Sequence, residues 1–524
     1  MDHHARVIVG AVVAVAILGA PAEAIGEPQL SLLRTAASAT AVRYDPNGPA
    51  RADVPVFVAA SSSSPFELRV TRARWGQRTV VTQVLHDHGG IRTRRLPRYV
   101  VPSFASGGLN RFFRLTVTDA KGMVLLSRAS SFCPSYRERV RPSAPEALVY
   151  PDVGCGVFAQ GNPFTLGQVW GIERGWGALA LGPDGSTFDL PNGTYTATLA
   201  ITSRYRRLLA LSAAVSAVRF TLRVRTDTSP CPPGPPGPFV PPGLPSPSGP
   251  LGPPGSPGPT ASACPPGPVA GASRAKDTDP DQPSAAPRRP VRGPASKPDP
   301  SILPDLAALP AWGIQSAVDE HGHDQLQFSA TVWNSGPAPL VVDGFRGRGQ
   351  DLMDAYQNFY RGAQRVGYRK VGSFEYDARP GHEHWHFRDF AAYTLVSTAG
   401  PRTVRSGKES FCLAPTDAED LTVPGALWRP MVTGFSSCGT RSSLSLREAM
   451  PVGWGDTYVQ TLPGQSFDIT GVPNGSYVIK VRANPYGRLL ERSRRNNVSL
   501  RRVTLGGTPG HRTAAAAAYR GING

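Results

Sequence analysis

Two stretches of the chain, residues 30–226 and 302–505, carry short apolar and β-branched runs separated by glycine, proline, asparagine and aspartate. In the first stretch, such runs lie at residues 56–58, 112–117 and 195–199. In the second, residues 326–332 alternate apolar and polar positions, as a half-buried strand does. Short β-prone runs with frequent turns are typical of sandwiches, so we predict a mainly β protein with two β-sandwich-like domains.

One segment departs from this pattern and predicts a helix. Apolar side chains recur there at intervals that suit an α-helix, at Met353, Tyr356, Phe359, Tyr360 and Ala363. We interpret this stripe as core packing, because an apolar stripe at helical spacing is more often a packed face than a cofactor-binding surface.

The two β-rich stretches also resemble each other. Five short matches occur in the same order and at a nearly constant offset, which is the signature of an internal repeat. The matches are Ser131-Phe132-Cys133 with Ser410-Phe411-Cys412, Gly154-Cys155-Gly156 with Ser437-Cys438-Gly439, Gly175-Trp176-Gly177 with Gly453-Trp454-Gly455, Phe188-Asp189 with Phe467-Asp468, and residues 190–195 with 472–477. We infer that the two halves share a fold; the alternative is that Asn-Gly turns recur because they are common.

The N-terminal segment, residues 1–24, has the pattern of a secretory signal peptide. Arg6 precedes an apolar run over residues 7–20, and Ala22-Glu23-Ala24 forms a small-x-small cleavage site. An uncleaved anchor is the alternative, although the run is short for a bilayer span. We therefore predict an exported, soluble protein with no stable membrane span, secreted or associated with the cell envelope.

Residues 229–300 differ in composition from both β-rich stretches, which occupy 25–228 and 301–505. The segment is rich in proline, glycine and serine and then becomes charged, which is typical of a linker. Glycine recurs there in a three-residue phase that Val240 and Ser246 interrupt, so a collagen-like or polyproline spacer fits better than a stable triple helix. The tail, residues 506–524, is small and polar, and we predict that it is disordered.

The net charge and the cysteines indicate what kind of partner and what redox compartment suit the protein. Of the 524 residues, 56 are Lys or Arg and 38 are Asp or Glu, so 56 minus 38 gives +18. This excess favours an anionic partner such as an envelope polymer, whereas the absence of a recognised module argues against nucleic acid. Six cysteines suit an oxidising compartment and fall in three successive pairs: Cys133 and Cys155, Cys231 and Cys264, Cys412 and Cys438. Pairing within each region is the simplest of the possible connectivities.

The densest chemical signal is the run of alternating histidines His382, His384 and His386, three of the ten in the chain. On a strand they would share one face, with Glu383 and Trp385 on the other. All three imidazoles can reach one ion only if the strand bends, and nitrogen ligands suit Cu(II), Zn or Ni. We predict a metal site here. Two other His-x-His pairs, His86 with His88 and His321 with His323, lie beside turn residues, and we interpret them as plain turns.

Further short motifs follow the histidines in the second stretch. Together with residues 382–395 they are residues 407–413 around Ser410-Phe411-Cys412, Asp456-Thr457-Tyr458, residues 467–470, residues 475–481, Asn484-Pro485 and Asn496-Asn497. With these motifs, roughly residues 302–505 resemble the catalytic domain of the lysyl oxidases. This resemblance implies that His382, His384 and His386 bind copper. It also implies that Lys408 and Tyr458 are joined as lysyl tyrosylquinone.

The same resemblance implies a secreted copper amine oxidase. Such an enzyme takes a primary amine, either a small amine or a lysine in a protein, and uses O2 to convert it to an aldehyde with release of hydrogen peroxide and ammonia. The α-proton would go to a base, for which Asp389 and Asp456 are both candidates. A separation of 50 residues between Lys408 and Tyr458 means that only folding can bring them together.

The chemistry does not repeat in the first half. There Lys408 corresponds to Ala129, Tyr458 to Leu179 or Ala180, and no histidine falls at the matching positions. The first half is therefore predicted to be a degenerate copy without metal ligands. Two other functions stay open: a zinc hydrolase, which would share the three-histidine site but lacks a His-Glu-x-x-His motif, and a non-catalytic surface protein that binds metal.

Overall fold

The computed structural model describes residues 29–522 with several gaps. The gaps are residues 88–89, 136, 152, 156–161, 183–185, 228–297, 363, 380–382, 409 and 431–435. The predicted signal peptide, nearly all of the predicted linker, Cys231, Cys264 and His382 fall outside the described residues.

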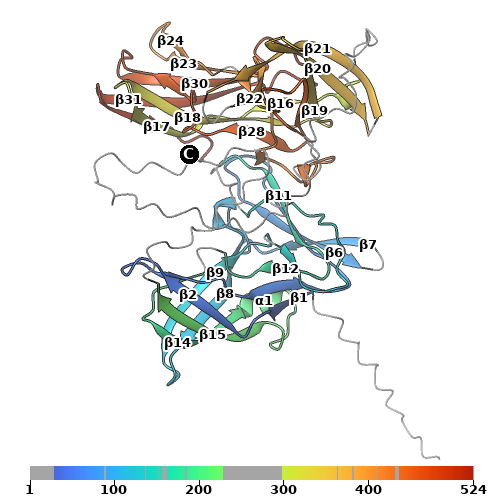
Figure 1. The fold of residues 1–524 in the computed structure, drawn as a ribbon, viewed down its shortest axis with the longest axis vertical. Helices are drawn as coiled ribbons and strands as arrows, with labels where there is room; N and C mark the ends of the chain where they lie inside the picture. The colour runs from blue at the N-terminus through green and yellow to red at the C-terminus, as the bar shows by residue number, and fades with distance from the viewer. Residues whose placement is uncertain are drawn as a thin grey trace, which may run out of the picture.

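The chain is mainly β and forms two β-rich halves, which Figure 1 shows one above the other. The first half contains β1 (Leu30–Arg34), β2 (Ser38–Arg43), β3 (Ala50–Arg51), β4 (Val56–Ala60), β5 (Phe66–Thr71), β6 (Val80–Asp87), β7 (Gly90–Leu96), η1 (Phe104–Ser106), β8 (Leu109–Thr118), β9 (Val124–Phe132), β10 (Arg137–Arg139), β11 (Gly167–Ile172), β12 (Trp176–Leu179), β13 (Thr187–Phe188), β14 (Gly193–Ile201), α1 (Ser203–Leu208) and β15 (Ala217–Thr226).

The second half has the same character. It contains η3 (Pro300–Ile302), β16 (Leu306–Ala308), β17 (Trp312–Val318), β18 (Asp324–Asn334), β19 (Leu340–Phe345), β20 (Leu352–Arg361), β21 (Gln364–Asp377), β22 (His384–Arg388), β23 (Ala391–Ser397), β24 (Thr403–Arg405), β25 (Ser410–Phe411), β26 (Asp417–Ala418), β27 (Ser445–Met450), β28 (Trp454–Tyr458), β29 (Ser466–Asp468), β30 (Gly475–Ala483), β31 (Val498–Thr508) and β32 (His511–Ala516). In the described part of the chain, no helix is both long and apolar enough to cross a bilayer.

Strand order is similar in the two halves. The order β1-β4-β12-β10 in the first half corresponds, strand for strand along the chain, to β16-β18-β28-β26 in the second. Likewise β11-β5-β6-β7 corresponds to β27-β19-β20-β21, a sheet that in the second half continues into β22 and β25. The two additional strands carry or adjoin the histidine motif. The second half therefore extends a common strand order where the predicted metal site lies.

Each half has its own apolar core, and smaller clusters join the halves. Tyr150 and Val169 of the first half pack with Leu421 and Trp454 of the second. A second joint cluster places Phe164 of the first half among apolar residues of the second: Leu309, Trp312, Trp333 and Ile522. The halves therefore bury apolar surface against each other.

The helix predicted over residues 353–363 is wrong for its described part, because residues 352–361 form strand β20; Ala363 lies outside the described residues. Alternate positions of this strand are buried: Met353, Ala355, Gln357 and Phe359. Because Gln357 is polar, the apolar residues of this strand do not alternate regularly in the sequence, although the buried positions do. Its amide exchanges two hydrogen bonds with the backbone of Leu490, which satisfies the buried polar group. The prediction that the segment packs in the core is confirmed for Met353 and Phe359.

The predicted disorder of residues 506–524 is also wrong for the described part, residues 506–522. Strand β32 pairs with β31 in a hairpin whose turn contains Gly510, and the Gly510 amide donates to the Asp324 carboxylate. Beyond the hairpin, Tyr519 and Ile522 pack against Trp75 and Phe164 of the first half. A small, polar composition misled the sequence prediction because the partners of this segment lie far away in the chain.

We expect Ile522→Ala to lower the free energy of unfolding by about 2 kcal/mol, because it removes a buried side chain from this cluster. Chemical denaturation of the full chain measures the change. Leu500→Ala is the matched control, since Leu500 is 53% exposed and its truncation should have little effect. Equal small effects for both variants would contradict a packed tail.

Candidate active site

Strand β22 places two of the three motif histidines on one side. It pairs with β21, where His384 faces Asp377 and His386 faces Glu375. The Nε2 atoms of His384 and His386 lie 3.0 Å apart. Two nitrogens that each lie about 2 Å from one ion are separated by this kind of distance, so the pair suits a shared metal.

The opposite side of β22 is anchored in the protein. Trp385 is buried, and its indole N–H donates to the carbonyl of Thr440 at 2.7 Å. The prediction that the tryptophan and the histidines project to different sides therefore agrees with the contacts. The third histidine, His382, lies outside the described residues, so the predicted bend stays a prediction.

The electrostatics of the pair favour metal binding. Burial lowers the pKa of His384 to about 4, with a smaller contribution from the charge of Lys408. Neutral imidazole is the form that binds a metal. The His386 Nδ1 lies 3.5 Å from the Asp377 carboxylate, which can orient the ring and leave Nε2 as the ligand atom. Although burial acts to raise the pKa of Asp377, hydrogen bonds from Arg379 lower it below its ordinary value.

Folding brings Lys408 and Tyr458 together. The Nζ atom of Lys408 lies 4.6 Å from the centroid of the Tyr458 ring and 5.6 Å from that of Phe411. Lys408 is only 3% exposed, and among the described residues its Nζ has no hydrogen-bond partner. Burial, followed by the charge of Arg379, lowers the pKa of Lys408 to about 8. A buried amine with a lowered pKa is a nucleophile poised beside the ring.

The Tyr458 hydroxyl is fixed by the backbone of Cys412. It accepts a hydrogen bond from the Cys412 amide at 2.8 Å and donates to the Cys412 carbonyl at 3.2 Å. Burial raises the pKa of Tyr458 well above its ordinary value, and the nearby Asp456 adds to the effect. The phenol is therefore held neutral and in one orientation.

The two candidate bases occupy different places. Asp456 is buried on β28, two residues before Tyr458, and its pKa is well above the ordinary value because of burial, while the charge of Lys408 acts in the opposite direction. Asp389 instead forms an ion pair with Arg488 at 2.5 Å. Of the two, Asp456 interacts with both Lys408 and Tyr458.

Comparison with known proteins agrees with this arrangement. A model of the lysyl oxidase family matches residues 367–513. Residues 367–513 are therefore similar to the lysyl oxidase family. Human lysyl oxidase homolog 1 is 34% identical over 119 residues, which are 22% of this chain and 18% of that protein. Zebrafish lysyl oxidase homolog 3B is 30% identical over 129 residues, or 24% of this chain and 14% of that protein. The chain thus aligns with less than a fifth of the length of these relatives.

Both predicted disulfides in the described part of the chain are present, Cys133–Cys155 and Cys412–Cys438. Within residues 367–513, the second bridge begins at Cys412, four residues after Lys408. The carbonyl of Cys438 accepts a hydrogen bond from the amide of Trp385 at 2.9 Å. The bridge therefore ties the lysine segment to the histidine strand.

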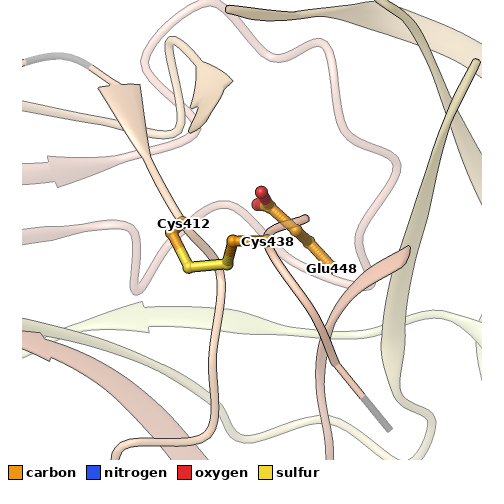
Figure 2. Close-up of side chains that lie close together, drawn as sticks. All are labelled: Cys412, Cys438 and Glu448. Atoms are coloured by element: carbon orange, nitrogen blue, oxygen red, sulfur yellow. A yellow bond between two sulfur atoms is a disulfide. The ribbon is translucent and has the colours of Figure 1, made fainter. Parts of the chain in front are cut away.

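A buried carboxyl group, Glu448, lies beside this bridge, and Figure 2 shows the three side chains close together. Glu448 accepts a hydrogen bond from the amide of Leu413 at 2.8 Å, and burial raises its pKa well above the ordinary value. Since both sulfur atoms are bonded to each other, this group is not a second metal site.

Sequence reasoning missed Glu448, Asp377 and Arg379. For Glu448 a signal existed: it alternates with Leu446 and Met450 along β27, so an acid stands on an apolar face. Asp377 and Arg379 carried no such signal, because their position beside the histidines depends on the pairing of β21 with β22. The pairs His321 with His323 and His86 with His88 were predicted to be turns. His321 and His323 do lie in a turn, whereas His86 lies on β6 and contacts Glu67. His88 falls outside the described residues.

Proposed function

We propose that the second half is a copper-dependent amine oxidase of the lysyl oxidase type. It would oxidise primary amines, either lysine side chains in proteins or small amines, to aldehydes, with O2 as the electron acceptor and hydrogen peroxide and ammonia as by-products. The observation that carries the proposal is the position of the Lys408 Nζ, 4.6 Å from the Tyr458 ring and close enough for its charge to act on His384 of the imidazole pair. The family match over residues 367–513 supports an oxidase function at the family level.

The residues present fit both expected cofactors. His382, His384 and His386 would hold Cu(II), and the close approach of two imidazole nitrogens, those of His384 and His386, supports this assignment. Lys408 and Tyr458 would provide the two side chains of lysyl tyrosylquinone. Copper would supply oxidising power for the tyrosine ring, and the quinone would supply a carbonyl that condenses with an amine and accepts its electrons.

The chain's own residues have separable roles. Burial keeps a fraction of Lys408 as the free amine near neutral pH. The Cys412 backbone fixes the ring of Tyr458 through its hydroxyl. Asp456 is the better candidate for the base, because it is buried beside both side chains and its raised pKa strengthens it as a proton acceptor, whereas Asp389 is held by Arg488.

The first half would be a degenerate copy of the same domain. Its similar strand order and its Cys133–Cys155 bridge support this proposal. We also propose secretion, because the cysteine usage and the predicted signal peptide suit an oxidising compartment. An anionic envelope polymer is a proposed partner of the basic surface.

The test uses the exported full chain after incubation with copper and oxygen. We expect a visible absorption band, a positive redox-cycling quinone stain, and oxygen consumption with peroxide release when a primary amine is added. Lysine-containing peptides and small alkylamines should be compared, because the ratio of their rates identifies the substrate class. A folded, copper-loaded protein with neither band nor amine-dependent oxygen uptake would contradict the proposal.

We expect the visible band to develop faster as the pH rises toward 8 and to change little above it. Only the unprotonated amine of Lys408 can attack the ring, and burial places its pKa at about 8. Below that value the rate should fall by about tenfold per pH unit. The measurement is the initial rate of band formation between pH 6 and pH 10. A rate that keeps rising to pH 10 would indicate an ordinary exposed lysine instead.

A further inference from the structure

The two halves meet at a buried polar node beside the strand that carries Tyr458. The node consists of Asn162 from the first half and Asp417, Glu419 and Thr457 from the second, each less than 9% exposed. The Asn162 side-chain amide donates to Asp417 Oδ2 at 2.8 Å and also to the Glu419 carboxylate. The Thr457 hydroxyl donates to the same Asp417 oxygen at 3.0 Å. One amide of the first half thus connects two buried acids with strand β28.

Backbone hydrogen bonds form a seam next to the node. The amides of Leu166 and Gly167 donate to the carbonyl of Glu419 at 2.6 and 3.1 Å, and the amide of Leu421 donates to the carbonyl of Gly167 at 2.9 Å. A Cβ atom on Gly167 would lie 2.2 Å from the Asp420 carboxylate, so the close approach requires glycine there. Figure 1 shows β11, which begins at Gly167, at the boundary between the halves.

The node leads directly to the candidate site. Strand β26, which contains Asp417, pairs with β28. Thr457 lies between Asp456 and Tyr458 on β28, and its amide donates to the Thr416 hydroxyl at 2.7 Å. Contacts on both the side chain and the backbone of Thr457 therefore fix the strand next to the tyrosine.

We infer that Asn162 is a positioning residue for Tyr458, so that the first half, although it lacks the metal ligands, forms part of the catalytic unit. The inference rests on the proposed function, in which Lys408 must reach the Tyr458 ring. Such a reaction is sensitive to position, since a displacement of about 1 Å can slow an intramolecular step by about 100-fold. Without the amide donor, two buried carboxyl groups would face each other with no shared partner, and β26 and β28 would move to relieve them.

The pKa values agree with this reasoning. Burial raises the pKa of Asp417 to about 6 and that of Glu419 well above its ordinary value, while the hydrogen bonds from Asn162 act in the opposite direction on both. Asn162→Asp replaces the only side-chain amide of the node with a third carboxyl group of the same shape. It should therefore disturb the node more than any other isosteric change.

The experiment compares four full-length proteins: the natural sequence, Asn162→Asp, the double variant Asn162→Asp/Asp417→Asn, and Trp75→Phe. The double variant returns one side-chain amide to the node, now at position 417 instead of position 162. Trp75→Phe is the control for general loosening of the two halves. Trp75 packs against Phe164 and Tyr519 in the second joint cluster, and the contact of Phe164 with Asn162 is a hydrogen bond from the Phe164 backbone amide, which the substitution leaves in place. Two quantities are measured: hydrogen–deuterium exchange of residues 454–458 in metal-free protein, and the rate at which the copper-dependent band develops.

We expect Asn162→Asp to accelerate exchange in residues 454–458 by about tenfold and to slow the band by at least as much, which corresponds to the loss of one hydrogen bond to a charged group. Exchange in the β20–β21 hairpin should be unchanged. The double variant should recover most of both effects, and Trp75→Phe should change neither. If Asn162→Asp does not accumulate as folded protein, Asn162→Ala removes the donor without adding charge and is interpreted in the same way.

Unchanged exchange at residues 454–458 in the Asn162 variants would overturn the inference, and so would an equal effect of Trp75→Phe, which would indicate general loosening of the two halves. Failure of the proposed function is distinguishable. If the natural sequence forms no band, the amine oxidase proposal fails, while the exchange measurement on metal-free protein still decides whether Asn162 positions β28.

Discussion

Lys408→Arg and Tyr458→Phe should each abolish the visible band, the quinone stain and amine-dependent oxygen consumption. An arginine side chain stays protonated, so it cannot add to the ring as the free amine does. Phenylalanine lacks the oxygen from which a quinone would form. Because each variant lacks one of the two side chains that would form the covalent cofactor, activity should fall below detection, with no slow residual rate.

Stability distinguishes this result from simple unfolding. Tyr458→Phe removes two hydrogen bonds to the Cys412 backbone and should destabilise the fold by about 1–2 kcal/mol, which leaves the protein folded. Lys370→Arg and Tyr360→Phe are matched controls, because Lys370 forms a surface ion pair with Asp354 and Tyr360 accepts a hydrogen bond from Arg447. A band that survives in Lys408→Arg or Tyr458→Phe would exclude these residues as the cofactor.

His384→Ala and His386→Ala should each weaken copper binding by at least about 100-fold, since even loss of an outer partner of a metal ligand weakens binding by about 10- to 100-fold. Both rings project to one side of β22 with their nitrogens 3.0 Å apart, so either change removes half of the described donor pair. Without bound copper, the band should also fail to develop.

Copper content after dialysis against a weak chelator measures the binding directly, and electron paramagnetic resonance reports nitrogen ligation of Cu(II). His321→Ala and His323→Ala are the controls, because these residues lie in the turn between β17 and β18. Copper retained equally by all four variants would show that the ion binds elsewhere. Preferential retention of zinc by the natural sequence, with no band, would instead favour the metal-binding or hydrolase alternatives.

Some parts of the site are predictable from the sequence because they depend on residues that are close together in the chain. Alternation of apolar and polar residues is a local property, so it identified the β class and placed His384 and His386 on one side of a strand. Cysteine order was sufficient for the two described disulfides, because each bridge closes within its own β-rich region. The short motifs around Lys408 and Tyr458 indicated the resemblance to the lysyl oxidases, since they too are local.

Properties that depend on distant partners required the tertiary structure. Only folding brings Lys408 to Tyr458, because β25 and β28 approach each other through the core and not along the chain. Asp456 and Asp389 look alike in the sequence, and the ion pair with Arg488, 99 residues away, separates them.

Dependence on distant partners also explains why the predicted disordered tail and the predicted helix were wrong. The tail is ordered by β31 and by Trp75 of the first half, and β20 hides its period behind Gln357, whose partner is Leu490. Asn162 belongs to no recognisable motif, and its inferred role depends on hydrogen bonds to two acids more than 250 positions later in the chain. The sequence by itself determined the strand class, the histidine face and a set of candidate residues for the proposed chemistry. The tertiary structure alone decided which of these residues meet and which acid lies beside them, because burial and distance are properties of the folded chain.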